Sequence, residues 1–473
     1  MSASQDQIFV GGEFVAASSS RRIPLTNPAT EEVFGQVVDA DEADVDAAVQ
    51  AARRALPAWR DTSVDDRIAV INRIADVMAS RADEMDALVT TENGAPQYWA
   101  KYVGSGAHFL YRMAAGAAAG LQRDEVKESQ SGRSVFRNDP IGVVGAIVPW
   151  NSPQVLIASK IGPAIAAGCT VVLKPSPETS LDGFMLGEIM AAAGVPDGVV
   201  NIISGGRETG AALVRHRGVD MVSFTGSTVA GRSIASVCGE QLKPVSAELG
   251  GKSAAVILDD GDVAAFAKTL FSEVIPYSGQ VCYATSRIIV HERLYEQVLD
   301  AVVEGFRSAP VGDPTDPATM VGPVISSAAR DKVEGYIASG REQGARVVLG
   351  GSRPSHLSKG YYVEPTVFVD VTPEMRIFQE EIFGPVAMVV PFRTDDEAVA
   401  LTNNSSYGLS GTLFGGDVER ATAVAARMET GRVTINGGRG FSRFSSLYKD
   451  SGIGSVGDVS PRLFLAPKNI IQP

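Results

Sequence analysis

A cysteine and a glutamate in this chain have surroundings that favour nucleophilic chemistry. Cys282 lies in Gly279-Gln280-Val281-Cys282, and Glu248 opens the glycine-rich turn Glu248-Leu249-Gly250-Gly251-Lys252-Ser253. As a thiolate, a cysteine can attack a carbonyl carbon and hold the product as a thioester. A nearby carboxylate can take the thiol proton or activate a water. The alternative is that Cys282 is a small buried hydrophobe and Glu248 a surface acid, but the glycines around both residues favour the chemical interpretation.

The composition indicates a globular protein and argues against several partners. The chain has 473 residues, a hydrophobic content of 45% and a net charge of −13. This length suggests two or three domains, and the negative charge argues against nucleic acid or an anionic membrane as a partner. No apolar run reaches the roughly 18–20 residues of a transmembrane helix, and residues 1–7 lack the pattern of a signal peptide. The three cysteines and four scattered histidines indicate neither a disulfide framework nor a metal site. We therefore expect a cytoplasmic protein without a metal.

The elements that would position these residues follow an α/β pattern. Helical spacing of apolar residues predicts helices over 41–58, where Asp41 can cap the first turn, and over 64–92 and 95–120. Short apolar runs then alternate with helical segments, as in parallel strands buried on both faces. This is the doubly wound dinucleotide-binding pattern. The predicted strands are 142–148, 170–173, 199–203 and 221–224 in a first series, and 254–258, 287–290, 345–349 and 386–390 in a second.

Two segments stand apart from this pattern. Residues 121–139 are polar and of mixed charge and contain Ser134-Val135-Phe136-Arg137, and residues 462–466 resemble a lone strand. An isolated edge strand needs a partner, so pairing between subunits is plausible.

The chain resembles the NAD(P)-dependent aldehyde dehydrogenase superfamily over nearly its whole length. Its motifs occur in the family's order: Pro149-Trp150-Asn151, Lys174-Pro175-Ser176, Phe224-Thr225-Gly226-Ser227, Glu248-Leu249-Gly250-Gly251-Lys252, Gly279-Gln280-Val281-Cys282 and Glu381-Ile382-Phe383-Gly384-Pro385. The resemblance implies an α/β fold with two doubly wound Rossmann-like domains and a small β oligomerisation arm. By the same resemblance, residues 1–120 and 139–247 form the dinucleotide-binding domain, 248–441 the catalytic domain, and 121–138 and 442–473 the arm and C-terminal strand of a homodimer or homotetramer.

The resemblance also implies a mechanism for oxidising an aldehyde to its acid. Cys282 would attack the aldehyde, and the Asn151 amide with the Cys282 backbone N–H would stabilise the oxyanion. Hydride transfer to the nicotinamide would leave a thioester, and Glu248 would activate the water that releases the acid. Lys160 matches a lysine associated with proton relay near that glutamate. From the residues alone, Asn151 could be a turn residue and Lys160 a surface lysine.

The dinucleotide site lacks the usual Gly-x-Gly-x-x-Gly fingerprint, and Gly226-Ser227-Thr228-Val229-Ala230-Gly231 stands in its place. Taken alone, this could be an ordinary turn between a strand and a helix. The position where NAD-preferring members often carry an acid is Pro177, with Glu178 next to it, so we favour NAD and keep NADP as the alternative. The residues assigned to the cofactor are Val148, Pro149, Trp150, Lys174, Ser176, Gly206, Gly210, Phe224, Thr225, Gly226, Ser227, Leu249, Gly250, Glu381 and Phe383.

The substrate residues that can be placed are Ser152, Ser159, Val281 and Tyr283. They are small or apolar and include no arginine or lysine, which favours a hydrophobic aldehyde of aromatic, terpenoid or medium-chain type. Two departures from the family pattern affect this region. No second glutamate follows the turn Ser451-Gly452-Ile453-Gly454, and Phe444-Ser445-Ser446-Leu447 replaces the usual roof of the substrate tunnel.

Two other functions compete with this hypothesis. A CoA-acylating semialdehyde dehydrogenase would share the fold, but that branch usually lacks the general-base glutamate, and Glu248 is present. A catalytically silent binding or structural protein would not need Asn151, Glu248 and Cys282 together.

Overall fold

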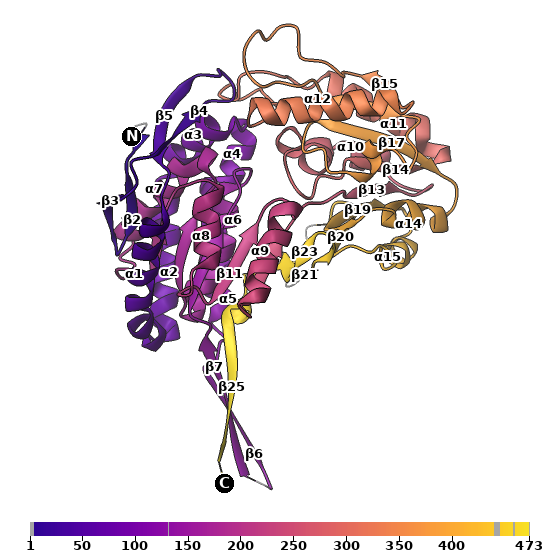
Figure 1. Ribbon diagram of the computed structural model, residues 1–473. Coiled ribbons are helices and arrows are strands. Elements are labelled where there is room, and N and C mark those ends of the chain that lie inside the picture. Colours follow the sequence, from indigo (N-terminus) through magenta and orange to yellow (C-terminus); the bar gives the residue numbers. More distant parts are fainter. Residues whose placement is uncertain (1–3, 131, 439–444, 457–458, 473) are drawn as a thin grey trace.

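The computed structural model describes residues 4–130, 132–438, 445–456 and 459–472. Two α/β lobes lie side by side, and a narrow three-stranded arm projects from the first lobe (Figure 1). The first lobe is built on an eight-stranded sheet and the second on a seven-stranded sheet. No helix in these ranges is long and apolar enough to cross a membrane.

Helices at the start of the chain cover the first lobe. Helix α1 (Glu42–Asp61) begins after Asp41, whose carboxylate accepts the N–H groups of Ala43 and Asp44, as the sequence predicts. The single helix predicted over 64–92 is wrong, because Arg81 leaves helical geometry (φ −110°, ψ 21°) and divides it. The predicted helix over 95–120 is likewise divided, at Gly104 (φ −89°, ψ −104°). The resulting helices are α2 (Val64–Ser80), α3 (Ala82–Asn93), α4 (Gln97–Val103) and α5 (His108–Ala118).

The first sheet has a parallel centre in the order β12-β11-β8-β9-β10. Its four predicted strands are confirmed, and β12 was not predicted. The chain builds outward from β8 in both directions, so the carboxyl ends of β8 and β11 border a crevice of the kind that binds ligands in doubly wound sheets. The parallel strands are β8 (Val143–Ile147), β9 (Thr170–Lys174), β10 (Val200–Ile202), β11 (Met221–Thr225) and β12 (Val245–Glu248). The connecting helices are α6 (Pro153–Ala167), α7 (Ser180–Ala192), α8 (Arg207–Arg215) and α9 (Thr228–Glu240), and the antiparallel flanks are β2 (Gln7–Val10), β3 (Glu13–Ala16) and β23 (Gly452–Ile453).

The second sheet has the order β15-β16-β17-β14-β13-β19-β20 and is parallel except at β15. The predicted strand over 345–349 therefore exists, but it pairs antiparallel with β16 at the edge of the sheet. The strands are β13 (Ala254–Ile257), β14 (Arg287–His291), β15 (Arg346–Leu349), β16 (Thr366–Val369), β17 (Val386–Phe392), β19 (Ser410–Phe414) and β20 (Arg432–Ile435). The helices are α10 (Val263–Ala267), α11 (Tyr295–Arg307), α12 (Ser327–Glu342), α13 (Arg376–Gln379), α14 (Asp395–Asn403) and α15 (Val418–Ala425).

The arm is an antiparallel sheet in which β7 lies between β6 and β25. The predicted strand over 462–466 has the wrong bounds, because Pro461–Phe464 form a 3-10 helix and the strand begins only at Leu465. The strand is not alone either, since it pairs with β7 along its whole length. The arm strands are β6 (Asp124–Ser129), β7 (Gly132–Pro140) and β25 (Leu465–Gln472). The remaining short strands are β1 (Ser4–Gln5), β4 (Arg22–Thr26), β5 (Val33–Val38), β18 (Tyr407–Gly408), β21 (Ser445–Ser446), β22 (Tyr448–Lys449) and β24 (Ser455–Val456).

Candidate active site

The candidate site lies where the two lobes adjoin, beside α9 and β23 (Figure 1). The carboxyl ends of the first sheet contribute Asn151, after β8, and Glu248, the last residue of β12. The amino ends of the second sheet contribute Cys282, in the loop before β14, and Glu381, in the loop before β17. Residues from four separate strand ends therefore meet between the sheets.

The loop before Cys282 has an unusual backbone. Tyr277 (φ 47°), Ser278 (φ 54°) and Gly279 (φ 75°) are successive left-handed residues. A Cβ on Gly279 would lie 2.0 Å from the carbonyl oxygen of Gly384, so only glycine allows the cysteine loop to touch the Glu-Ile-Phe-Gly-Pro loop. A non-glycine residue in this region costs on the order of 1–3 kcal/mol and persists only where the surroundings hold it.

Buried hydrogen bonds hold this loop in place, and most of them involve Gln280. Its side chain donates to the carbonyl of Pro323 (3.3 Å) and accepts the backbone N–H of Ile325 (2.9 Å). The Ser278 hydroxyl donates to the carbonyl of Gly322 (2.8 Å). On the other side, a Cβ on Gly251 would lie 2.2 Å from the Cys282 carbonyl oxygen, which explains why the turn after Glu248 is rich in glycine.

The thiol of Cys282 is protonated at neutral pH in this environment. Burial, as the largest cause, and the carboxylates of Glu381 and Glu248 together raise its pKa to about 12, while Arg432 acts in the opposite direction. Cys282 is a free cysteine, as are Cys169 and Cys238.

Asn151 is 4% exposed and contacts the cysteine loop directly. Its amide nitrogen donates to the carbonyl of Gln280 (2.8 Å), and its own carbonyl accepts the indole N–H of Trp99 (3.3 Å). A side-chain amide has two N–H groups, so the bond to Gln280 leaves a second donor for a bound oxygen.

The carboxylate of Glu248 is oriented by its neighbour on the next strand. The Thr225 hydroxyl donates to it (3.2 Å), and the two residues are directly paired between β11 and β12. Lys160 of α6 is buried, which lowers the pKa of its ammonium, while Glu248 acts in the opposite direction. The backbone carbonyl of Ser451 accepts the N–H of Leu249 (2.9 Å) and so fixes the end of β12.

The crevice between β8 and β11 is bordered by about half of the residues assigned to the cofactor. Val148, Pro149 and Trp150 continue β8, Phe224 and Thr225 end β11, and Gly226 leads into α9. The Ser227 hydroxyl caps α9 by accepting the N–H of Ala230 (3.3 Å). An exposed helix N-terminus at this position suits a phosphate group.

Lys174, Gly206 and Gly210 lie together at the ends of β9 and β10. The Lys174 ammonium donates to the carbonyls of Pro175 (2.8 Å) and Gly205 (2.7 Å), and burial lowers its pKa to about 8. Gly210 packs against the Lys174 side chain, since a Cβ there would lie 3.4 Å from the lysine Cε. The Ser176 hydroxyl donates to Glu178, which places a carboxylate beside this cluster.

The residues assigned to the nicotinamide side come from the second lobe. Glu381 accepts the N–H of Gly251 (3.0 Å), and a Cβ on Gly250 would lie 2.7 Å from its carboxylate. The ring of Phe383 meets that of Trp150 edge-on at 5.7 Å. The glycines next to Leu249 thus let the turn lie directly against the Glu381 carboxylate, and a carboxylate two residues before a ring fits a ribose with its attached base.

The substrate side is dominated by aromatic residues. Val281 packs against a cluster that contains Trp99 and Tyr277, with Trp150, Val155 and Tyr283 partly buried against it. Ser152 precedes α6 and is 8% exposed, and the Ser159 hydroxyl donates back to the carbonyl of Leu156 (2.9 Å). Ser152 is thus a short, buried side chain just before α6, and Ser159 is a short, partly buried side chain within it. Of the altered roof, Phe444 lies outside the described residues.

Sequence reasoning missed two features of this site. Trp99 and Tyr277 were not assigned, although their rings stack at 6.1 Å behind the cysteine loop. Arg432 was not assigned either, and its guanidinium lies over the ring of Tyr283 at 5.8 Å. No motif marks Arg432, because the short strand β20 that it begins was not predicted.

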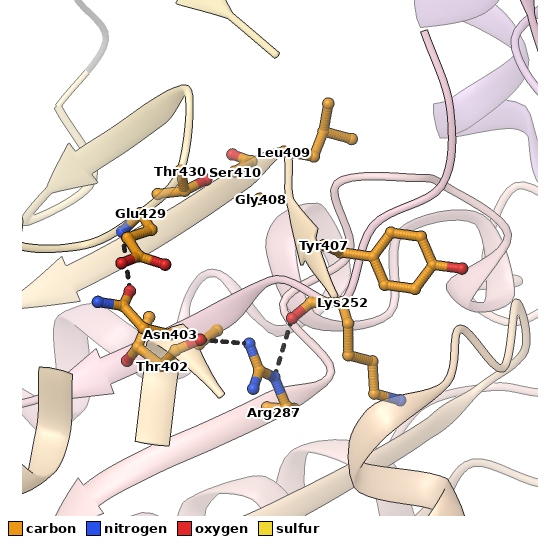
Figure 2. A pocket seen from close by; sticks show the side chains of 11 residues that line it. Lys252, Arg287, Thr402, Asn403, Tyr407, Gly408, Leu409, Ser410, Glu429 and Thr430 are labelled. Atoms are coloured by element: carbon orange, nitrogen blue, oxygen red, sulfur yellow. Dashed lines mark hydrogen bonds between the residues drawn. The ribbon is translucent and has the colours of Figure 1, made fainter. Parts of the chain in front are cut away.

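A small buried pocket lies behind the turn that follows Glu248 (Figure 2). Arg287 donates to the backbone carbonyls of Lys252 (2.8 Å) and Thr402 (2.9 Å), and its guanidinium lies 4.9 Å from the ring centroid of Phe378. The Lys252 ammonium is buried without a hydrogen-bond partner among the described residues, and burial lowers its pKa to about 7. Residues that line this pocket, Arg287 above all, support the turn, and no catalytic candidate is among them.

The fold and the site define a thiol-containing dehydrogenase with a doubly wound dinucleotide crevice. A sequence model described as Aldehyde dehydrogenase family matches residues 14–462. The chain belongs to this family, whose members are oxidoreductases that convert aldehydes to acids.

Three relatives show the extent of the similarity. Geranial dehydrogenase of Castellaniella defragrans is 44% identical, over 92% of each chain. A crystal structure of a Mycobacterium tuberculosis aldehyde dehydrogenase complexed with NAD+ is 40% identical, with a TM-score of 0.94 over 100% of this chain and 99% of that one. A mutant of aldehyde dehydrogenase C from Pseudomonas syringae, in complex with NAD+ and octanal, is 35% identical, with a TM-score of 0.95 over 99% and 97%.

Proposed function

We propose that this enzyme oxidises hydrophobic aldehydes to carboxylic acids with NAD+ through a thioester on Cys282. The observation that carries the proposal is the convergence of Cys282, Asn151 and Glu248 beside the crevice between β8 and β11. The overall reaction consumes the aldehyde, NAD+ and water and yields the acid, NADH and a proton.

The first half of the reaction uses Cys282 and Asn151. The thiolate attacks the aldehyde carbon, and the second N–H of the Asn151 amide, with the Cys282 backbone N–H, donates to the developing oxyanion. NAD+, when bound, accepts the hydride that leaves this carbon. The hydrogen bond from the Asn151 amide to the Gln280 carbonyl attaches Asn151 to the cysteine loop, so the amide and the thiol keep a fixed relative position.

The second half uses Glu248. Its carboxylate takes a proton from the water that attacks the thioester, and the acid departs as the thiol is restored. Thr225 orients the carboxylate, and we assign Lys160, buried nearby on α6, to the proton's exit path. No acid follows the Ser451–Gly454 turn in the positions 455–457, so deacylation depends on Glu248.

The residues around the crevice support NAD+ as the cofactor. Ser227 and the start of α9 would hold a phosphate, Lys174 and Ser176 the adenosine ribose, and Glu381 the nicotinamide ribose, with Phe383 beside the ring. Glu178 places negative charge next to Ser176, which disfavours the 2′-phosphate of NADP. We assign the remaining residues of the cofactor site to the same role: Val148, Pro149, Trp150, Gly206, Gly210, Phe224, Thr225, Gly226, Leu249 and Gly250.

The aromatic wall around Val281 and Tyr283 supports a hydrophobic substrate. Ser152 and Ser159 leave space on α6 for its body. Burying each methylene is worth about 0.8 kcal/mol. The names of two relatives, a geranial dehydrogenase and an enzyme complexed with octanal, agree with a terpenoid or medium-chain aldehyde.

We also propose a role for each part of the chain. Residues 1–120 and 139–247 bind the dinucleotide, 248–441 carry the thiol, and 121–138 with 442–473 form the arm that assembles a homodimer or homotetramer. The three free cysteines fit a reducing compartment such as the cytoplasm.

A panel of aldehydes assayed at 340 nm tests this proposal. We expect NADH formation with octanal, geranial and benzaldehyde, at a higher kcat/KM than with acetaldehyde, and a lower kcat/KM with NADP+ than with NAD+. Formation of an acyl-CoA rather than the free acid, when CoA is present, would assign the chain to the acylating branch. A flat chain-length profile would refute the hydrophobic pocket.

A further inference from the structure

We propose that Arg432 binds a carboxylate at the end of the substrate remote from the aldehyde, so that the preferred substrates are apolar aldehydes with a terminal acid group. This inference rests on the proposed function, because it concerns the same substrate site. It adds an anionic group to the hydrophobic body already described.

The position of Arg432 relative to the nucleophile is the first observation. Arg432 begins β20 at the edge of the second sheet, and its guanidinium carbon lies 5.8 Å from the centroid of the Tyr283 ring. Tyr283 directly follows Cys282. A cation thus lies against the ring of the residue that directly follows the nucleophile.

The guanidinium lacks an anionic partner. Among the described residues, the side chain of Arg432 has the ring contact with Tyr283 and no ion pair or hydrogen bond. A guanidinium has five N–H donors in a planar fork that matches a carboxylate. Arg432 is partly buried, and none of its nitrogens is among the fully buried unpaired atoms of the described residues, so the fork stays accessible to a bound carboxylate.

One protein carboxylate, Glu273, faces the same group of side chains. It acts electrostatically on Tyr283 and Tyr102, and Arg432 acts on it. Its distance from Arg432 exceeds the 4.0 Å of an ion pair, and burial raises its pKa. Glu273 therefore leaves the fork of Arg432 open to a ligand.

The surroundings define the rest of the ligand. Tyr102 is 54% exposed, and its ring lies 5.2 Å from that of Trp99, which belongs to the buried aromatic cluster around Val281. These two rings connect the surface with the cluster around Val281, the residue before the thiol, and Arg432 acts electrostatically on Tyr102. They suit an apolar body whose aldehyde reaches Cys282 and whose carboxylate forms a bidentate pair with Arg432.

Pairs of substrates that differ only at the remote end test this inference. The pairs are 4-carboxybenzaldehyde with 4-methylbenzaldehyde, and 9-oxononanoic acid with nonanal, so that one body is short and rigid and the other long and flexible. The readout is the ratio of kcat/KM for the acid to kcat/KM for its neutral partner, measured by NADH formation in the whole enzyme.

Substitution of Arg432 should lower this ratio. For Arg432→Met we expect a loss of roughly tenfold to a hundredfold in at least one pair, the range for losing a hydrogen-bonded charge. The ratio for Arg432→Lys should lie between those of the wild type and Arg432→Met, because lysine keeps the charge but not the fork. This variant replaces Arg432→Met in the test if the methionine variant does not fold. Arg346→Met is the matched control, since Arg346 begins β15 at the opposite edge of the same sheet and pairs with Asp370. It should leave the ratio unchanged.

The outcomes separate the two proposals. If the neutral aldehydes are oxidised and both pairs give the same ratio in wild type, Arg432→Met and Arg432→Lys, the inference about Arg432 is overturned and the proposed function stands. If wild type forms no NADH with any neutral or acidic aldehyde, the proposed function itself fails.

Discussion

At the residue scale, the chemistry depends on a thiol that is not yet a thiolate. Burial and two carboxylates hold the pKa of Cys282 near 12, so a base or the bound ligands must favour its ionisation. Glu248 and Glu381 both raise this pKa as charged neighbours. Each also has a second role in the proposed mechanism, since Glu248 would act as a base and Glu381 would hold the nicotinamide ribose.

Alkylation of the cofactor-free enzyme tests this electrostatic picture. Because only the thiolate reacts, the rate of Cys282 labelling by iodoacetamide should rise about tenfold per pH unit between about pH 7 and pH 10. Glu381→Gln removes one negative neighbour, so it should lower the thiol pKa and raise the rate at a fixed pH. Mass spectrometry with Cys282→Ala as the unlabelled control gives the rates, and a plateau below pH 8 in the wild type would disprove the picture.

The two possible roles of Glu248 can be separated by kinetics. Glu248→Gln keeps the shape of the side chain and a partner for Thr225 but removes the base. Steady-state turnover should fall by about 100-fold or more, while rapid mixing should still show a burst of NADH near one per active site. Disappearance of the burst together with turnover would instead assign Glu248 to activation of the thiol.

The residue types of the candidate site could be predicted from motifs, whereas several of their partners could not. Glu248, Asn151 and Cys282 stand in recognisable local patterns. The hydroxyl of Thr225 on Glu248 and the guanidinium of Arg432 over Tyr283 depend on which strands become neighbours. Such contacts leave no pattern within a few residues of either partner.

At the element scale, the loop before Cys282 is the least regular part of the site. Three successive left-handed residues bring Gly279 against Gly384, and the side chain of Gln280 ties the loop to the segment around Pro323. The loop's geometry therefore depends on buried polar contacts rather than on helix or strand pairing. This is also why only the cysteine, and not the shape of its loop, could be predicted.

Gln280→Leu tests the importance of these contacts. Leucine matches the volume but leaves the Ile325 N–H and the Pro323 carbonyl unpaired, which costs about 1–3 kcal/mol for a buried group. We expect a lower urea midpoint and a lower kcat, because Asn151 is bonded to the same residue. Gln50→Leu on the exposed face of α1 is the control. An unchanged midpoint in Gln280→Leu would show that the loop is held by other means.

Most strands that are buried on both faces were predicted correctly, although β16 and β19 were not. Of the strands that are less buried, β15 was predicted, whereas β12 and β20 were not. The strands β8, β9, β10 and β11 are continuous buried runs. In contrast, β12 and β20 are short and only partly buried, so their composition does not distinguish them from loops. The divided helices follow from local breaks at Arg81 and Gly104, which the apolar periodicity does not show.

At the scale of the whole molecule, the arm is the part with least contact to either lobe (Figure 1). Val126, Val135 and Ile470 are directly opposite one another across β6, β7 and β25 and therefore share one face of the arm. Val126 is 45% and Ile470 39% exposed. An apolar row of this kind on a thin sheet needs a covering surface, and a second copy of the chain would supply it.

The combined substitution Val126→Glu and Ile470→Glu should disrupt assembly. If the arm joins subunits as we propose, charges on this face would be buried in that contact, so the molar mass by light scattering should fall toward the 49.6 kDa of one chain. Leu242→Glu, at a 92% exposed position on the first lobe, is the control. An unchanged mass in the double variant would place the contact elsewhere.

NADH formation by Cys282→Ala with octanal and NAD+ tests the covalent mechanism at its nucleophile. We expect a fall to the background rate, with NAD+ binding retained in a fluorescence titration. Cys169→Ala, which replaces a fully buried thiol far from Glu248 in the sequence, should keep its catalytic rate wherever it folds. Near-normal NADH production by Cys282→Ala would contradict the covalent mechanism, because no other thiol in this chain lies beside Asn151 and Glu248 in the residues that the structure describes.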